Sequence, residues 1–70
     1  MSTHRETRRE PLIDTLSAAL LLNTSPRTLE RWRIEGAGPP YVKVGRRVRY
    51  DVVALQRWVD ERTIGAAHPA

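Results

Sequence analysis

The sequence predicts a mainly helical domain with one small β-hairpin, in the order helix, tight turn, second helix, hairpin and third helix. Residues 25–36 carry a helix start, helically spaced apolar residues and a glycine stop. Residues 41–50 form two β-rich runs around a glycine. Residues 51–63 repeat apolar residues at helical spacing behind an aspartate. Together these patterns predict a chain in which helices pack around a short hairpin.

Composition excludes several function classes. The chain has no cysteine, which excludes disulfides, thiolate metal sites and cysteine nucleophiles. No apolar run approaches the length of a membrane span, and the first ten residues lack the apolar core of a secretory signal. No carboxylate pair lies in a predictable cleft, and no glycine loop opens a helix after a strand. We therefore expect no enzyme activity, no cofactor, no metal and no membrane partner, and a cytoplasmic protein.

The domain is expected to span residues 12–63. Residues 1–11 are polar and mixed in charge, and we expect them to form a flexible arm. Residues 64–70 are expected to form a flexible tail. Three arginines of the arm could reach phosphates or a minor groove of DNA, although such arms are more often simply disordered: Arg5, Arg8 and Arg9.

The first helix is expected over residues 15–22, with Asp14 as its N-cap. Its small residues lie on one side and allow a close approach to the second helix. Leu16 and Leu20 lie roughly opposite, one turn apart. We favour the interpretation that residues 12–13 or the third helix cover this pair. The alternative is an exposed patch for self-association or for another protein.

The second helix has the clearest boundaries in the chain. Asn23 tolerates the left-handed conformation that an abrupt turn between two helices needs. Ser25 is a good N-cap, and Pro26 suits the first helical position because its missing N–H has no partner there. Gly36 supplies the left-handed residue that ends the helix. These residues indicate the turn and second helix of a helix-turn-helix.

The second helix also has two distinct faces. At 100° per residue, Leu29, Trp32 and Arg33 fall on one side. Arg27 and Arg31 fall on the opposite side, one turn apart. A short helix that packs through one face and presents arginines on the other fits the major groove of DNA. The alternative is that both arginines are ordinary exposed helix residues, partly neutralised by nearby glutamates.

The hairpin is expected to join residues 41–44 to residues 48–50 through a three-residue turn at 45–47. Pairing Val44 with Val48 gives one apolar face, which we expect against the core: Val42, Val44, Val48 and Tyr50. The opposite face is then basic and aromatic: Tyr41, Lys43 and Arg49. Like charges facing each other across a strand pair repel, so this outer face favours an anionic partner.

The positive charge of the chain is concentrated in this hairpin. The net charge is +4, residues 1–40 contribute +1 and residues 51–70 contribute −1. Residues 41–50 contain no acid and four basic side chains: Lys43, Arg46, Arg47 and Arg49. A basic hairpin beside outward arginines predicts a wing that contacts a polyanion. Charge alone would equally fit a solvated surface strand.

The third helix is expected to begin after Asp51 and to run to about Thr63. Five residues at helical spacing form the stripe that we expect to face the core, and Arg62 contributes only its aliphatic stem: Val52, Leu55, Trp58, Val59 and Arg62. With this helix in place, the predicted fold class is a winged helix-turn-helix.

Three segments carry a resemblance to a known family: SPRTLERWR, GPPYVKVGRRVRYD and LQRWV. In this order they resemble the excisionase family of small winged helix-turn-helix proteins. Relatives of that family include the DNA-binding domain of mercury-resistance regulators and prophage regulators of the AlpA type. The resemblance covers about residues 12–59. It implies that the second helix enters the major groove and that the wing follows the backbone or minor groove. It also implies four core positions: Trp32, Tyr50, Leu55 and Trp58.

The resemblance implies a set of DNA-binding residues in the second helix and in the wing: Ser25, Arg27, Thr28, Arg31, Lys43, Arg46, Arg47 and Arg49. Leu16 and Leu20 depart from the family pattern, which often has polar residues there. Ile34 falls on the outward side of the second helix, where it would tuck under Tyr41 and the wing or touch another protein. We treat these three apolar residues as candidate protein contacts.

The function expected from this resemblance is that of an excisionase, a recombination directionality factor of bacterial or phage origin. Such a protein binds and bends DNA near an attachment site and promotes integrase-mediated excision of a mobile element or prophage. The expected partners are double-stranded DNA, further copies of the chain, and a tyrosine or serine recombinase. The alternatives are a transcriptional regulator of integrase or prophage genes, a protein-interaction module that binds a recombinase, and the DNA-recognition part of a packaging or replication complex.

Overall fold

The computed structural model describes residues 11–65 and contains three helices and a small three-stranded antiparallel sheet. The elements follow each other in this order: β1 (Leu12–Ile13), α1 (Thr15–Leu21), α2 (Pro26–Glu35), β2 (Val42–Val44), β3 (Arg47–Asp51) and α3 (Val52–Glu61). The order of helices and hairpin predicted from the sequence is confirmed. Most of the expected arm, with its three arginines, and residues 66–70 of the expected tail lie outside the described residues.

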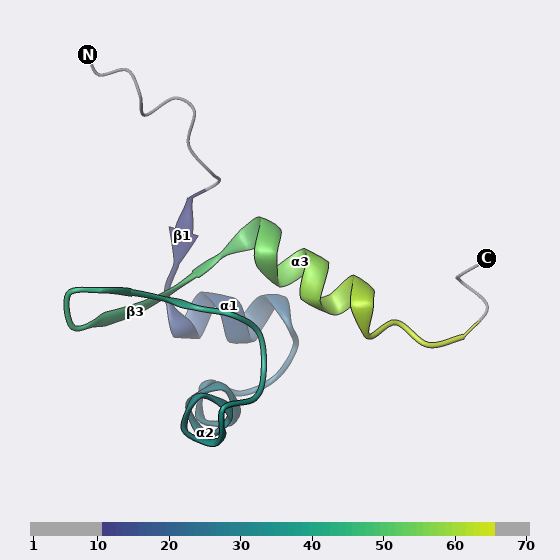
Figure 1. Cartoon of the computed structure of the whole chain (residues 1–70), viewed down its shortest axis with the longest axis horizontal. Helices are drawn as coiled ribbons and strands as arrows, with labels where there is room; N and C mark the ends of the chain where they lie inside the picture. Colours follow the sequence, from purple (N-terminus) through teal and green to yellow (C-terminus); the bar gives the residue numbers. More distant parts are fainter. Residues whose placement is uncertain (1–10, 66–70) are drawn as a thin grey trace, which may run out of the picture.

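Helix α1 begins and ends through local contacts. Asp14 is its N-cap, because one carboxylate oxygen accepts a hydrogen bond of 2.9 Å from the backbone N–H of Ser17. The helix ends at Leu21, one residue earlier than expected, and Asn23 then takes the predicted left-handed conformation with a φ of 55°. The chain therefore turns sharply, and α2 is seen end-on in Figure 1 while α1 lies across the view.

Helix α2 has the predicted boundaries. The Ser25 hydroxyl accepts a hydrogen bond of 3.1 Å from the backbone N–H of Thr28, and Gly36 ends the helix with a φ of 75°. Gly38 follows with a φ of 84°, and a Cβ atom there would lie 2.9 Å from Cβ of Trp32. A glycine is therefore required at this position, both for the backbone conformation and for the close approach to the Trp32 side chain.

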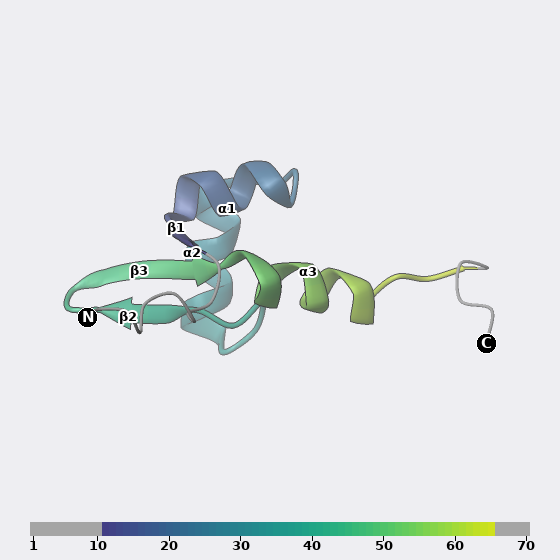
Figure 2. The ribbon, with the colours of Figure 1, turned by 90° about the horizontal axis from the view of Figure 1, so that it is seen from above.

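The sheet contains a strand that the sequence did not predict. Its order is β1-β3-β2, with Leu12 opposite Asp51 and Ile13 opposite Tyr50. Strand β1 is only two residues long, and both residues are apolar, so its sequence lacks the alternation of apolar and polar residues that predicts a strand. It becomes a strand because β3 offers it a hydrogen-bonding edge, so the fold contains more than the expected hairpin. Figure 2 shows β2 and β3 side by side, with α1 beyond β3.

The predicted register of the hairpin is wrong by one residue. The observed pairs are Val42 with Arg49, Lys43 with Val48, and Val44 with Arg47. The turn therefore has two residues rather than three. Gly45 occupies its first position with a φ of 66°, as in a type II′ turn, which suits the twist of a tight hairpin.

The register changes which residues share a face. Lys43 lies opposite Val48, on the face that carries the buried Tyr50. The ring of Tyr41 contacts the ring of Tyr50, with centroids 6.2 Å apart, so Tyr41 also belongs to this face. The expectation that Lys43, Arg49 and Tyr41 share the outer face is therefore wrong. The outer face carries two valines and two arginines: Val42, Val44, Arg47 and Arg49.

The core is small and lies where α1, α2, β3 and α3 meet. Within the part of the chain that the structure describes, five buried hydrophobic residues form this core: Ala18, Ala19, Leu29, Tyr50 and Leu55. The two buried alanines of α1 allow the close approach to α2 that the sequence predicted. Tyr50 and Leu55 are confirmed as core residues. Trp32 and Trp58 are only partly buried, and their rings contact each other with centroids 5.9 Å apart.

Helix α3 lies at one end of the molecule and the hairpin at the other, as Figure 1 shows. The helix ends at Glu61, two residues earlier than expected. Its predicted stripe packs only in part, because Leu55 is buried whereas Val59 is 36% exposed. The outer half of α3 therefore contributes little to the core.

The interpretation that Leu16 and Leu20 are covered is wrong. Their exposed fractions are 59% and 74%, and the neighbouring Leu21 is also largely exposed. Residues 12–13 cannot cover them, because these residues pair with β3 as a strand. Helix α1 therefore presents three leucines on its surface.

Candidate nucleic-acid interface

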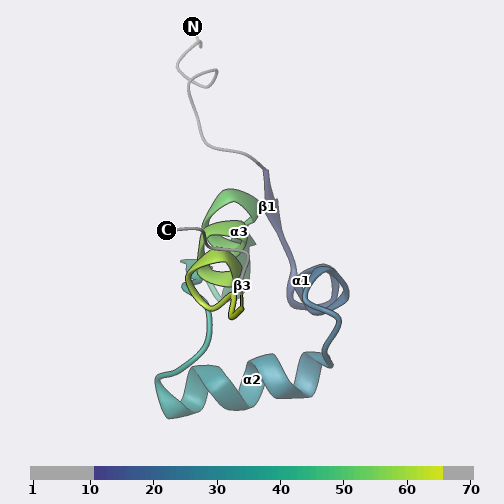
Figure 3. The same cartoon turned by 90° about the vertical axis from the view of Figure 1, so that its right-hand side faces the viewer.

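The outward face of α2 carries Arg27, Arg31 and Ile34, all exposed, while Leu29 on the other side is fully buried. Helix α2 lies at the edge of the molecule, with α1 and α3 on one side of it (Figure 3). The division into a packed face and an outward face therefore follows the prediction. The three side chains of the outward face are therefore accessible from solvent.

Charge on this outward face is balanced. The Nε atom of Arg31 lies 3.6 Å from a carboxylate oxygen of Glu35, one turn further along the helix. Both side chains are more than half exposed, so this ion pair contributes little to stability. Glu30 is also exposed and follows Arg27 by three residues, so it adds a negative charge near this face. The face therefore offers directed hydrogen-bond donors with little net attraction for a polyanion.

Ser25 and Thr28 lie at the start of α2 and are engaged with each other. Beyond the capping hydrogen bond, their hydroxyl oxygens lie 2.9 Å apart. Their first role is thus to fix where α2 begins. This placement leaves Arg27 in the first turn, close to the end of the helix that carries the positive dipole charge.

Arg33 holds α2 against the sheet and α1. Its Nη1 atom donates a hydrogen bond of 2.7 Å to the Tyr50 hydroxyl and a longer one of 3.4 Å to the Thr15 hydroxyl. Its guanidinium carbon also lies 5.7 Å from the ring centre of Tyr41. The sequence placed Arg33 on the packed face but did not identify these partners. The available signal was the position itself, since an arginine on a packed face needs acceptors there.

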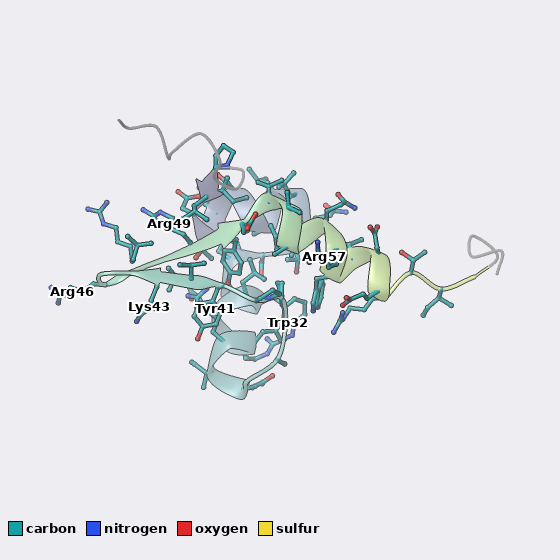
Figure 4. All side chains as sticks on the ribbon, turned by 45° about the horizontal axis from the view of Figure 1, so that its top comes forward. Trp32, Tyr41, Lys43, Arg46, Arg49 and Arg57 are labelled. Atoms are coloured by element: carbon teal, nitrogen blue, oxygen red, sulfur yellow. The ribbon has the colours of Figure 1, made fainter. Side chains whose placement is uncertain are left out.

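The basic residues of the hairpin fall into two groups. Lys43, Arg46 and Arg47 are exposed towards its outer end, and Figure 4 shows Arg46 at the tip. Arg49 lies nearer the base, is half-buried, and donates a hydrogen bond of 2.8 Å to the carbonyl oxygen of Val48. The sequence grouped all four residues, whereas in the structure three of them are exposed and Arg49 is half-buried.

Arg49 also lies within electrostatic reach of the cap of α1. The pKa of Asp14 is lowered, first by the hydrogen bond from the backbone N–H of Ser17 and then by the Ser17 side chain, with a smaller contribution from the positive charge of Arg49. Desolvation opposes this change and is a larger effect than the contribution of Arg49. Arg49 therefore adds a small part of the effect that lowers the pKa of Asp14.

The candidate protein contacts come from two helices. Leu16 and Leu20 project from α1, and Ile34 projects from the outward face of α2. Ile34 is not tucked under Tyr41, because 86% of its side chain is exposed. That sequence-based interpretation is therefore wrong, and Ile34 shares its surface with the two outward arginines.

An apolar groove of about 380 Å³ lies between the end of α1 and α3, and the sequence did not predict it. Leu21 and Val59 line it, together with the two tryptophans. The guanidinium carbon of Arg62 lies 4.1 Å from the ring centre of Trp58 and forms part of its wall. Within residues 11–65 no cluster of acids and histidines suits a metal ion, and no helix there has the length and apolar character to cross a membrane.

Comparison with known proteins agrees with this geometry. A protein family described as a helix-turn-helix domain matches residues 17–63. The match covers most of α1 and all of α2, the hairpin and α3. No curated protein matches the sequence.

Proposed function

The chain belongs to this family of helix-turn-helix domains, which implies a DNA partner, and we propose that it is a sequence-specific DNA-binding excisionase. In this proposal it binds repeated sites beside an attachment site, bends the DNA, and promotes excision of a mobile element or prophage by an integrase. The chain itself breaks no bond. Its contribution is to shape the DNA on which a tyrosine or serine recombinase acts.

The observation that carries the proposal is the pairing of an outward helix face with a basic hairpin in one small domain. A major groove admits an α-helix, and among the described elements none lies on the outward side of α2. The hairpin then acts as the wing, with its exposed basic residues on the DNA backbone or in a narrow minor groove. The segments that resemble excisionases include both parts.

The two parts are proposed to have different roles. Arg27 and Arg31 read base edges, while Ser25 and Thr28 support them by fixing the start of α2. The wing residues contact phosphates and provide most of the affinity: Lys43, Arg46 and Arg47, with Arg49 in a lesser role. A side chain that contacts phosphate carries no sequence information directly, whereas a bidentate arginine on guanine does.

Contacts with proteins are proposed for the exposed apolar residues. Leu16 and Leu20 would contact a further copy of the chain on adjacent DNA, or the recombinase. Such contacts would let several copies bind side by side. The protein would then act in the bacterial cytoplasm, on the nucleoid or on phage DNA.

An excision assay tests the proposal. Purified protein is added to a candidate integrase and to a plasmid that carries both attachment sites of that integrase. We expect excision to depend on the wild-type protein and to be lost with Arg27→Ala/Arg31→Ala. DNA binding without any effect on excision would contradict the excisionase role. It would instead support the second candidate, a transcriptional regulator of integrase or prophage genes.

The exposed leucines of α1 favour one further candidate, a protein-interaction module. The DNA-binding and protein-interaction hypotheses differ in which surface is needed for excision. If Arg27→Glu/Arg31→Glu left excision intact while Leu16→Asp or Leu20→Asp abolished it, the domain would act through a recombinase and not through DNA. Because all four side chains are exposed, none of these substitutions is expected to unfold the domain.

A further inference from the structure

Ile34 is the most exposed large apolar side chain within the helices and strands, with 86% of its surface accessible. It lies on the third turn of α2, and no other element covers it. A single exposed apolar side chain is common on protein surfaces, so the exposure of Ile34 alone does not indicate a partner. The position of Ile34 on α2, on the same face as two exposed arginines, is what indicates one.

The position of Ile34 relative to the two outward arginines defines that partner. Arg27, Arg31 and Ile34 follow each other at spacings of four and three residues, which places them on one face. Residues at the same spacings read bases in the recognition helix of homeodomains. From Arg27 to Ile34 the helix rises about 10 Å, which corresponds to roughly three base-pair steps.

The surroundings of Ile34 offer a phosphate little net positive charge, because Glu35 is paired with Arg31. The carboxylate of Glu35 follows Ile34, and the last turn of α2 carries the negative end of the helix dipole. Glu30 lies one turn earlier and is also exposed. An apolar group here can still approach the floor of the major groove, where the thymine 5-methyl is the apolar group that base pairs present.

We propose that Ile34 is a specificity-determining residue that contacts the 5-methyl group of a thymine in the major groove. This inference deepens the proposed DNA binding and rests on it. It moves Ile34 from the candidate protein contacts to the base-reading surface. Helix α2 then reads one end of its site with arginine donors and the other end with an aliphatic side chain.

The test uses deoxyuridine, which differs from thymidine only in the missing 5-methyl group. A target duplex is first selected from a random library with the full chain. Each thymine in that duplex is then replaced by deoxyuridine, one at a time, and binding is measured. We expect one or two replacements to weaken the wild-type protein about fourfold, the value for one buried methyl group. Those replacements should leave the affinity of Ile34→Ala unchanged.

Val53→Ala is the matched control, because it shortens another exposed β-branched side chain, on α3, to which no DNA or protein contact is assigned. It should retain the full thymine preference. If Ile34→Ala weakens thymine and deoxyuridine duplexes equally, or if no thymine position responds in the wild type, the inference is wrong while specific DNA binding stands. If no sequence is enriched from the library, the proposed sequence-specific function fails instead.

Discussion

Helix α2 and the hairpin are neighbours that differ in how they are held and in what they offer. Helix α2 is fixed along its length by a cap at each end, by the buried Leu29, and by the hydrogen bond from Arg33 to Tyr50. The hairpin is anchored only at its base, through Tyr50 and Val48, and its outer end is exposed. One region holds its side chains in place, whereas the other extends its side chains into solvent.

Their charges differ in the same way. The outward face of α2 balances two arginines with two glutamates, whereas residues 41–50 contain four basic residues and no acid. Base reading requires fixed geometry, and attraction of a polyanion requires uncompensated charge. The proposed function assigns discrimination to α2 and affinity to the hairpin, and the following substitutions test that division.

The largest effect is expected from Lys43→Ala/Arg46→Ala/Arg47→Ala. Each lost phosphate contact should reduce the salt slope by about 0.9, so three should reduce affinity about 100-fold near physiological salt. Selected and random duplexes should lose affinity equally. Titrations over a salt series measure both quantities, and Arg57→Ala on α3 is the control for a lost surface charge (Figure 4). A loss confined to the selected duplex would refute the assignment of affinity to the wing.

The next effect concerns discrimination. Arg31→Ala should weaken the selected duplex about tenfold and a random duplex less than about twofold, because a bidentate base contact discriminates by about 1–3 kcal/mol. Its ion pair with Glu35 is exposed, so its loss should not lower stability measurably. Arg46→Ala is the matched comparison and should weaken both duplexes alike. Equal behaviour of the two variants would remove the distinction between helix and wing.

The two regions also differ in how far the sequence could predict them. The boundaries of α2 were predictable because Ser25, Pro26 and Gly36 act on their immediate neighbours. The outward position of Arg27 and Arg31 followed from helical spacing alone. The register of the hairpin depended on whether Gly45 opens a turn of two or three residues. A turn of three residues was predicted because it places all the apolar residues of the hairpin on one face. In the structure Val42 and Val44 lie outside the core, so no burial of these two side chains favours that register.

Long-range packing accounts for the remaining differences. Strand β1 exists only because β3 lies beside it, a pairing between residues almost forty positions apart that no local pattern records. The exposure of Leu20 depends on where α3 lies, since a leucine has the same local signature whether or not a distant helix covers it. The partners of Arg33 likewise come from α1 and β3. The exposed face of α2 was therefore easier to predict than the tertiary contacts that hold α2 in place.

A smaller effect should follow from loosening the link between the two regions. Tyr50→Phe removes the hydroxyl that accepts from Arg33 and leaves the buried ring in place. We expect the free energy of unfolding to fall by about 1.5 kcal/mol, as for other hydrogen bonds to charged groups. Urea denaturation followed by tryptophan fluorescence measures it. Tyr41→Phe removes a hydroxyl from the more exposed neighbour and should change stability by less than about 0.5 kcal/mol.

The smallest effect separates Arg49 from the other wing residues. Because the pKa of Asp14 is lowered in the folded chain, its ionised form stabilises the fold above the usual value of 3.8, and this stabilisation is lost as the pH falls through the lowered pKa. Asp14→Asn keeps a capping oxygen but has no charge. We expect it to be less stable than the wild type at neutral pH and to approach the wild type in acid, as measured by thermal unfolding across that range. Arg49→Ala should reduce the difference in stability between proteins with and without Asp14→Asn at neutral pH. Arg46→Ala, at the tip of the hairpin, should leave that difference unchanged. The same outcome for both arginine variants would show that Arg49 belongs with the tip and has no separate role at the base of the wing.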